Sequence, residues 1–286
     1  MSWIRRHLVS LILYGIALIG AGLIAYPTFS DWWNSFHQSR AVASYASAVS
    51  DMNTETYDEL FAQAEDYNKK LSETGTVWIM DDEQLEEYNS LLRVDDSGVM
   101  GYINIPKINI MLPVYHGIDE AVLQVAIGHL EGTSLPTGGG STHCVVSGHR
   151  GLPSARLFTD LDKLVVGDTW TVNVLNRTLT YEVDAIHIVE PTDLSLLAIE
   201  EGKDLFTLVT CTPYGINTHR LLVRGHRVEN AQGDAEVVAD ALQIDTGYTA
   251  IFMGVPVLLV LFLWAMTSTG RRRRRARRTR RTVRQR

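Results

Sequence analysis

Two long uncharged apolar runs constrain the organisation of this chain more than any other feature. Residues 8–27 read LVSLILYGIALIGAGLIAYP, and residues 248–266 read YTAIFMGVPVLLVLFLWAM. A run of about 20 apolar residues is long enough to cross a bilayer as a helix. The runs therefore predict two flanking transmembrane helices, with a separate folded unit between them. Each run could instead be a buried core helix, and the first could be a cleaved signal peptide, although the aromatic residues that follow it suit a membrane interface.

Charge is distributed very unevenly along the chain. All 33 Asp and Glu lie between residues 28 and 246, whereas the tail 271–286 holds eleven of the 26 Lys and Arg. Arg5 and Arg6 precede the first apolar run. Basic flanks remain in the cytoplasm, so we expect a cell-membrane protein with both termini cytoplasmic and its central segment extracellular. An arginine tail directly after a span favours contact with membrane lipid over nucleic acid, and no nucleic-acid partner is expected.

The segment between the apolar runs changes character near residue 99. Residues 28–98 are predicted to be helical, because apolar residues recur at helical spacing up to Gly75 and a second short helix fits residues 82–92. The rest of the chain divides into four parts: a β domain (99–233), a linker (234–247), the second span (248–266) and a basic cytoplasmic tail (267–286). The cytoplasmic N-terminus and first span together occupy residues 1–27.

Short alternating strands fill the β domain. Residues 170–174 and 179–183 alternate in hydrophobicity on either side of Asn176-Arg177, which predicts a hairpin. Residues 205–211 and 221–228 are predicted as two further strands. Many short strands separated by turns favour a mainly β, closed barrel over a parallel α/β sheet.

The chain has two cysteines, and their positions differ. Cys211 ends the strand LFTLVTC, because Pro213 cannot continue a central strand. Arg220 opens the next strand, so antiparallel pairing would place Cys211 and Arg220 at one edge of the sheet. In an oxidising compartment, a Cys144–Cys211 disulfide in a non-enzymatic receptor or adhesin is the alternative.

Spacing alone leaves more than one histidine that could act with Cys211. His149 ends the strand HCVVSGH before the turn residues Arg150 and Gly151. Cys144 lies five residues before His149, so the two face opposite sides of a regular strand, and Cys144 is expected to be a buried small side chain. Among nine histidines, His219 is the strongest competitor because it lies in the loop after Cys211; His116, His129 and His143 lie in loops or near glycine.

A thiol, an imidazole and a guanidinium at one edge suit nucleophilic catalysis. A free thiol with a pKa near 8.5 is only a few per cent thiolate at neutral pH. An imidazole can accept its proton and later protonate a leaving amine. An arginine can hold the substrate or a developing oxyanion. This chemistry requires neither metal nor cofactor, and none is expected.

Several motifs resemble those of the sortase family. The segments Thr207–Cys211 (TLVTC) and Arg220–Arg227 (RLLVRGHR) resemble the sortase cysteine and arginine motifs, and Ser147–Gly151 (SGHRG) resembles the histidine motif. IPKI (Ile105–Ile108) resembles the early strand of sortases. Residues 100–228, including GHLEGTSLP and LFTDLDKL, are similar to the class C, pilin-assembling branch, as are the two apolar spans and the segment YPTFSDWW. The resemblance covers most of the chain.

The resemblance implies a fold and an activity. It implies an eight-stranded barrel in which Cys211 is the nucleophile and His149 and Arg220 are its partners. Such an enzyme would cleave a Leu-Pro-x-Thr-Gly-like motif between Thr and Gly and join the acyl group to a lysine amine of a pilin subunit. The implied partners are pilin subunits or other surface proteins with a C-terminal sorting motif. A sortase that uses a peptidoglycan amine is the alternative.

Class C sortases often carry a lid with an Asp-Pro-aromatic motif over the cysteine. The corresponding stretch here reads TVWIMDDEQ and lacks that motif. A modified lid is one interpretation, with Trp78 as an apolar plug and Asp81 or Asp82 paired with Arg220. The alternative is that Trp78 merely packs on the barrel and Asp81 is solvated.

Overall fold

The computed structural model describes residues 2–230. Three helices come first: α1 (Ser2–Ser50), α2 (Thr54–Thr74) and α3 (Asp82–Ser90). They are followed by the strands β1 (Val99–Ile105), β2 (Ile110–His116), β3 (Ile127–His129), β4 (Thr142–Ser147), β5 (Thr169–Val174), β6 (Arg177–Val189), β7 (Asp204–Thr212) and β8 (His219–Val228). Short helices lie in the connections: α4 (Glu120–Leu123), η1 (Pro106–Ile108), η2 (Leu161–Lys163) and η3 (Ser195–Leu197).

The eight strands close into a barrel in the order β1-β2-β3-β4-β7-β8-β6-β5. Most neighbouring strands are antiparallel, but β2 with β3 and β4 with β7 are parallel. The predicted mainly β, closed eight-stranded barrel with N-terminal helices is therefore confirmed. The parallel pairing of β4 with β7 brings together two segments that are far apart in the sequence.

Large aromatic side chains fill the barrel interior. The predicted hairpin forms between β5 and β6, with Val174 opposite Arg177. Its alternating residues turn Trp170 and Tyr181 inward, where their rings stack 6.1 Å apart. Phe206 of β7 lies 5.2 Å from the Tyr181 ring. Because side chains fill the interior, a functional site is expected at the strand ends or on the outer face of the barrel.

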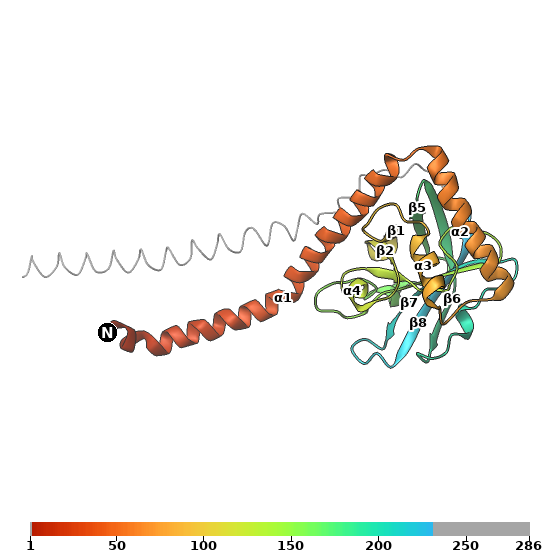
Figure 1. The fold of residues 1–286 in the computed structure, drawn as a ribbon. Helices are drawn as coiled ribbons and strands as arrows, with labels where there is room; N and C mark the ends of the chain where they lie inside the picture. Colours follow the sequence, from red (N-terminus) through yellow and green to blue (C-terminus); the bar gives the residue numbers. More distant parts are fainter. Residues whose placement is uncertain (1, 231–286) are drawn as a thin grey trace, which may run out of the picture. The chain divides into compact units, whose positions relative to one another are not determined.

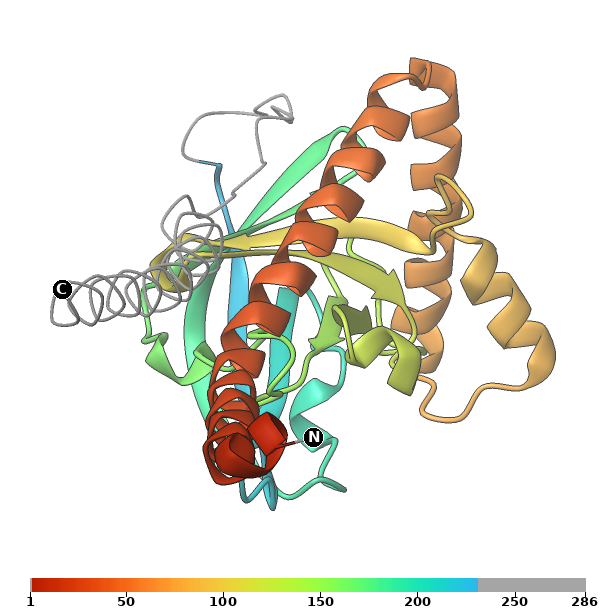
Figure 2. The same ribbon diagram turned by 90° about the vertical axis from the view of Figure 1, so that its left-hand side faces the viewer.

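Helices α1 and α2 pack against the barrel (Figures 1 and 2), and each also makes a buried polar contact with it. The Tyr45 hydroxyl of α1 donates to the Met100 carbonyl at 2.9 Å and accepts from the Leu175 amide at 2.8 Å. The Asn68 amide of α2 exchanges two hydrogen bonds with the Leu135 backbone, at 2.9 and 2.7 Å. Both contacts satisfy backbone groups that would otherwise be buried without partners.

The N-terminal helix differs from its prediction. A span ending at residue 27 was expected, yet α1 continues through Pro27 to Ser50 as one 49-residue helix. Among residues 2–230, no helix combines the length and apolarity needed to cross a membrane. The predicted transmembrane helix at 8–27 thus finds no support here, and the linker, the second span at 248–266 and the basic tail lie outside the described residues.

Candidate active site

Cys211 and Arg220 lie side by side at one end of the barrel. Cys211 is the penultimate residue of β7, Arg220 is the second residue of β8, and the antiparallel register places them directly opposite each other. Directly opposed residues in an antiparallel pair point to the same face. Cys211 is partly exposed. The pairing expected from the short connection is therefore observed, and thiol and guanidinium share one face of the sheet.

His149 lies level with Cys211 on the neighbouring strand. Strand β4 runs parallel to β7 with Ser147 opposite Val209. The register continues past the end of β4, because the Gly148 amide donates to the Val209 carbonyl at 3.1 Å. One residue beyond His149, the Arg150 Nη1 donates to the Thr212 hydroxyl at 3.1 Å. His149 is bracketed by these two contacts, and the register places it opposite Cys211.

The face that carries Cys211 is the outer face of the barrel. Residues of this face form a small apolar cluster beside the cysteine, separate from the barrel core: Val145, Leu197, Val209 and Leu222, with Leu130, Val189 and Leu194 packed against it. The members Leu194 and Leu197 come from the connection between β6 and β7. An extended peptide lying along this face would meet apolar side chains before it reached the thiol.

Polar contacts, most of them partly buried, hold the β6–β7 connection in place. The Arg224 guanidinium donates to the carboxylates of Asp184 and Glu200, with the Glu200 contact at 2.8 Å. The His143 Nδ1 lies 2.8 Å from the Ala198 carbonyl oxygen, and its Nε2 lies 2.7 Å from the Thr207 hydroxyl. Burial lowers the pKa of His143. His143 is therefore a structural group of this connection.

Cys144 is separate from this site. It is 2 % exposed and belongs to the barrel core. Burial raises the pKa of its thiol well above the usual range. Both cysteines are free thiols, so the alternative of a Cys144–Cys211 disulfide in a receptor or adhesin is wrong. The two residues face opposite sides of the sheet, which prevents their direct pairing.

The competing histidines have other partners or other faces. His219 lies opposite Thr212, on the face turned away from Cys211, and its Nδ1 contacts the Thr218 hydroxyl. His129 is completely buried between the Tyr88 hydroxyl and the Ser134 carbonyl. Its burial lowers the pKa to about 4. These positions favour His149 as the imidazole beside Cys211.

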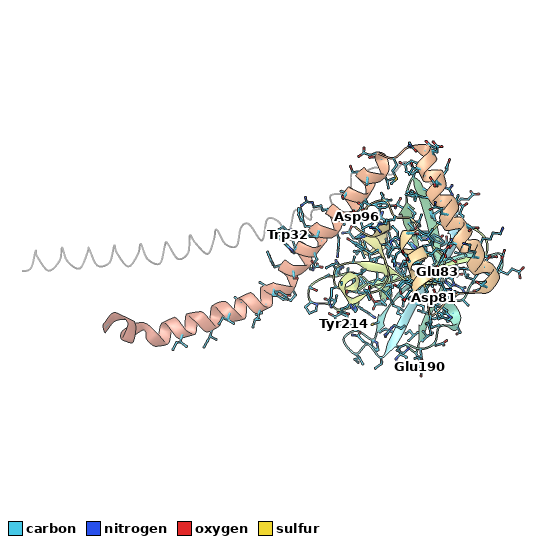
Figure 3. The ribbon with its side chains drawn as sticks, in the orientation of Figure 1. Trp32, Asp81, Glu83, Asp96, Glu190 and Tyr214 are labelled. Carbon is cyan, nitrogen blue, oxygen red and sulfur yellow. The ribbon has the colours of Figure 1, made fainter. Side chains whose placement is uncertain are left out.

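A groove of about 420 Å³ opens behind the end of β7, on the opposite side from the thiol. Its lining includes Arg150, Asp162, Ile188, Thr212 and Tyr214. In Figure 3, Tyr214 lies with Glu190 at the end of the barrel where β6 and β7 finish. The sequence predicts Arg150 only as a turn residue. Its position directly after His149 was the available signal that it could contribute to the site.

Asp81 and Arg220 do not form the predicted ion pair. The Asp81 carboxylate caps α3 by accepting from the Gln84 amide at 2.8 Å, and the Gln84 side chain accepts from the Asp81 amide. The Arg220 guanidinium donates to the His219 carbonyl at 3.2 Å. Figure 3 shows Asp81 well apart from Tyr214, which follows β7. Asp81 is used locally instead, because an aspartate directly before a helix accepts a hydrogen bond from a backbone amide that would otherwise be unpaired.

The other proposed lid residue, Trp78, is 41 % exposed. Its neighbour Val77 donates its amide to the Gly132 carbonyl at 3.0 Å, which attaches this segment to the β3–β4 connection. The approach is so close that a Cβ atom at Gly132 would lie 1.8 Å from the Val77 carbonyl oxygen. A role for Trp78 as a lid stays a prediction.

The geometry agrees with comparisons to known proteins. A sortase domain model matches residues 103–228. Sortase C1 from Streptococcus agalactiae is 59% identical, with a TM-score of 0.66 and coverage of 67% of this chain and 99% of that chain. Sortase C from Streptococcus pneumoniae is 41% identical, with a TM-score of 0.61 and coverage of 67% and 97%; its structure is described in terms of catalysis and pilin substrate specificity.

A curated relative extends the comparison. Sortase D from Bacillus subtilis is 31% identical over 131 residues, which span 45% of this chain and 63% of that protein. The match thus covers somewhat less than two thirds of the relative. The chain belongs to the sortase family of cysteine transpeptidases, and its structural similarity is to the class C members of that family.

Proposed function

We propose that this enzyme cleaves a Leu-Pro-x-Thr-Gly-like sorting motif between Thr and Gly and joins the acyl group to a lysine amine of a pilin subunit. Cys211 is the nucleophile, His149 the acid–base group and Arg220 the group that holds the carbonyl oxygen. The observation that carries the proposal is the shared level of the three residues on neighbouring strands, with Cys211 opposite Arg220 and His149 bracketed beside it.

In the first half of the reaction, the Cys211 thiolate attacks the threonine carbonyl carbon. The carbonyl oxygen becomes an oxyanion, which the Arg220 guanidinium stabilises because it remains charged at all relevant pH values. The carbon–nitrogen bond then breaks, and the His149 imidazolium protonates the departing glycine amine. The product is a thioester between Cys211 and the threonine carbonyl.

In the second half, an amine resolves the thioester. A lysine amine attacks the thioester carbon, His149 accepts the proton that the amine loses, and the carbon–sulfur bond breaks to return the Cys211 thiolate. The similarity to a pneumococcal enzyme described for its pilin specificity supports a pilin lysine as the acceptor. The outer apolar cluster beside Cys211 provides a surface for the apolar part of a sorting motif.

The proposed location follows from the substrates and the sequence. Pilin subunits are assembled outside the cell, so the barrel is placed outside and the two termini inside, at the cell membrane. The basic residues that flank the apolar runs 8–27 and 248–266 support this arrangement.

The activity can be tested with the full-length protein and a Leu-Pro-x-Thr-Gly peptide. Mass spectrometry should detect an acyl adduct on Cys211 whose mass corresponds to cleavage after threonine. Addition of a pilin fragment with an accessible lysine should discharge the adduct into an amide-linked product. Discharge only by a peptidoglycan-like amine would support the cell-wall-anchoring alternative, and absence of any adduct would refute the proposed acyl transfer.

A further inference from the structure

Arg150, the residue after His149, has a side chain that is almost completely buried. Its exposed fraction is 8%, against 48% for the Asp162 carboxylate that it contacts at 2.5 Å. The Nη1 atom donates to the Thr212 hydroxyl at 3.1 Å, whereas Nε is buried without a hydrogen-bond partner among the described residues. A buried guanidinium with incomplete pairing lowers stability, so packing alone gives no reason for an arginine at this position.

The surroundings keep this guanidinium in place. The Tyr214 ring lies over it, with the ring centroid 5.9 Å from the guanidinium carbon. Gly151 has a φ of +77°, and a Cβ atom there would lie 3.0 Å from the Tyr214 ring. The absence of a side chain at Gly151 therefore allows the ring to settle against the His149–Gly151 segment.

The contact to Thr212 determines which face of β7 Arg150 reaches. Thr212 follows Cys211 directly, so the two side chains point to opposite faces of the strand. Thr212 is 7 % exposed and lies on the inner side, where the groove opens. Arg150 therefore contacts β7 on its inner face, whereas the Cys211 thiol lies on the outer face. It cannot replace Arg220 as the group that stabilises an oxyanion.

Arg150 nevertheless connects the segment that carries His149 to strand β7, which carries Cys211. His149 lies beyond the last ladder residue of β4, where regular strand pairing no longer fixes its position. Its level relative to Cys211 is set on one side by the Gly148 backbone, which is hydrogen-bonded to Val209 and Thr210, and on the other by the Arg150–Thr212 hydrogen bond. The His149 carbonyl also accepts from the Phe158 amide at 3.2 Å. Loss of the Arg150–Thr212 contact would remove the tie to β7 on the C-terminal side of His149 and leave the Gly148 contacts on the other side.

We propose that Arg150 is a positioning residue that holds His149 level with Cys211 through its hydrogen bond to Thr212. The inference rests on the proposed function, because it presumes that His149 and Cys211 act together. Asp162 and Tyr214 orient the guanidinium for this contact. Displacement of a reacting group by about 1 Å can cost about 10²-fold in rate, which sets the size of the effect expected.

The test compares Arg150→Gln, Arg150→Lys, Thr212→Val and the double variant Arg150→Gln/Thr212→Val in the full-length protein. Thr212→Val keeps the side-chain volume and removes the hydroxyl that accepts from Arg150. It therefore tests the same hydrogen bond even if the Arg150 variants fold poorly. Arg156→Gln is the matched control, since Arg156 lies in the same connection and pairs with Asp160 without reaching β7. Two quantities are measured: kcat and KM for a sorting-motif peptide, and the pH profile of Cys211 alkylation by iodoacetamide.

We expect Arg150→Gln to lower kcat by about 10²-fold with little change in KM, and to shift the alkylation profile toward that of His149→Ala. Arg150→Lys should recover part of the loss, because a single ammonium can replace one contact but not both. Thr212→Val should act in the same direction, and the double variant should lose no more than Arg150→Gln alone. Arg156→Gln should match the wild type.

Two outcomes would overturn the inference, and they are distinguishable. A lower melting temperature with unchanged kcat and an unchanged alkylation profile in Arg150→Gln would show that Arg150 only stabilises the fold. Multiplicative losses in the double variant would show that Arg150 does not act through Thr212. If His149→Ala itself left both readouts unchanged, the proposed function would fail together with this inference.

Discussion

At the scale of single residues, the two cysteines are predicted to differ completely in function. Cys211→Ala should abolish both cleavage and transfer, because no other residue on that face provides a thiol. Cys144→Ala should retain most activity and lower the free energy of unfolding by about 1 kcal/mol, since Cys144 fills space in the core. Peptide-cleavage assays and urea unfolding of both variants provide the measurement. Reversed results would exchange the two roles.

The partners of Cys211 are tested by a second comparison. His149→Ala should reduce kcat/KM by about 10²–10⁴-fold, the usual contribution of acid–base help. Arg220→Ala should reduce it by about 10²–10³-fold, the usual cost of losing one group that stabilises an oxyanion. His219→Ala should have a much smaller effect, because His219 pairs with Thr212 on the face away from the thiol. An inactive His219→Ala beside an active His149→Ala would transfer the imidazole role to His219.

At the scale of elements, variants in the segment before α3 can show whether it only caps the helix or also covers the active site as a lid. Asp81→Ala removes the cap of α3 and should lower stability by about 1 kcal/mol, while Asp81→Asn, which keeps the acceptor, should be nearly neutral. If Trp78 shields the thiol, Trp78→Ala should raise the rate of Cys211 alkylation more than Asp81→Ala does. Equal rates in wild type, Trp78→Ala and Asp81→Ala would mean that the segment is not a lid.

The attachment of α3 to the barrel predicts acid sensitivity. His129 accepts from the Tyr88 hydroxyl while neutral, and burial lowers its pKa from 6.5 to about 4. Because the unfolded chain binds this proton more readily, the stabilisation is complete above pH 6.5 and is lost as the pH falls toward 4. The loss should amount to roughly 2–3 kcal/mol.

Urea unfolding at pH 7.5 and pH 4.5 would measure this loss. His129→Gln should be less stable at pH 7.5 but should show a smaller decline between the two pH values. His116 and His143 also have lowered pKa values through burial, so they contribute with the same sign and remain in the variant. An unchanged pH dependence in His129→Gln would contradict the assignment.

At the scale of the whole molecule, the proposed topology can be tested on intact cells. A membrane-impermeant lysine reagent should label the segment 28–246, for example at Lys203, which is exposed in the structure. Cysteines introduced into the arginine tail should stay unlabelled until the cells are opened. Labelling of the tail in intact cells would place the C-terminus outside and contradict the proposed location.

Parts of the fold that depend on neighbouring residues could be predicted from the sequence. The β5–β6 hairpin follows from alternation around a turn, and the Cys211–Arg220 pairing follows from a connection of a few residues. Asp81 at the start of α3 was missed as a cap, although Gln84 three residues later was the signal of a capping box. Such a capping box can be read from the sequence because both of its residues lie within one helical turn.

Contacts across long sequence separations could not be predicted in this way. No local pattern places Cys144 opposite Phe206 or selects parallel pairing for β4 and β7. The choice of His149 therefore depended on resemblance to a family, and the contribution of Arg150 was not foreseen. The buried position of His129 was also missed, because its partners Tyr88 and Ser134 lie on other segments.

The parallel pairing of β4 with β7 also bears on when the thiol becomes reactive during folding. Ser147 and Val209 are 62 positions apart in the chain, and such non-local pairings form late because a long loop must close first. Until β4 and β7 join, Cys211 has no imidazole beside it, even if the local β7–β8 pair has formed. A newly made or partly unfolded chain therefore lacks the imidazole partner of Cys211, and catalytic competence reports the closure of the barrel.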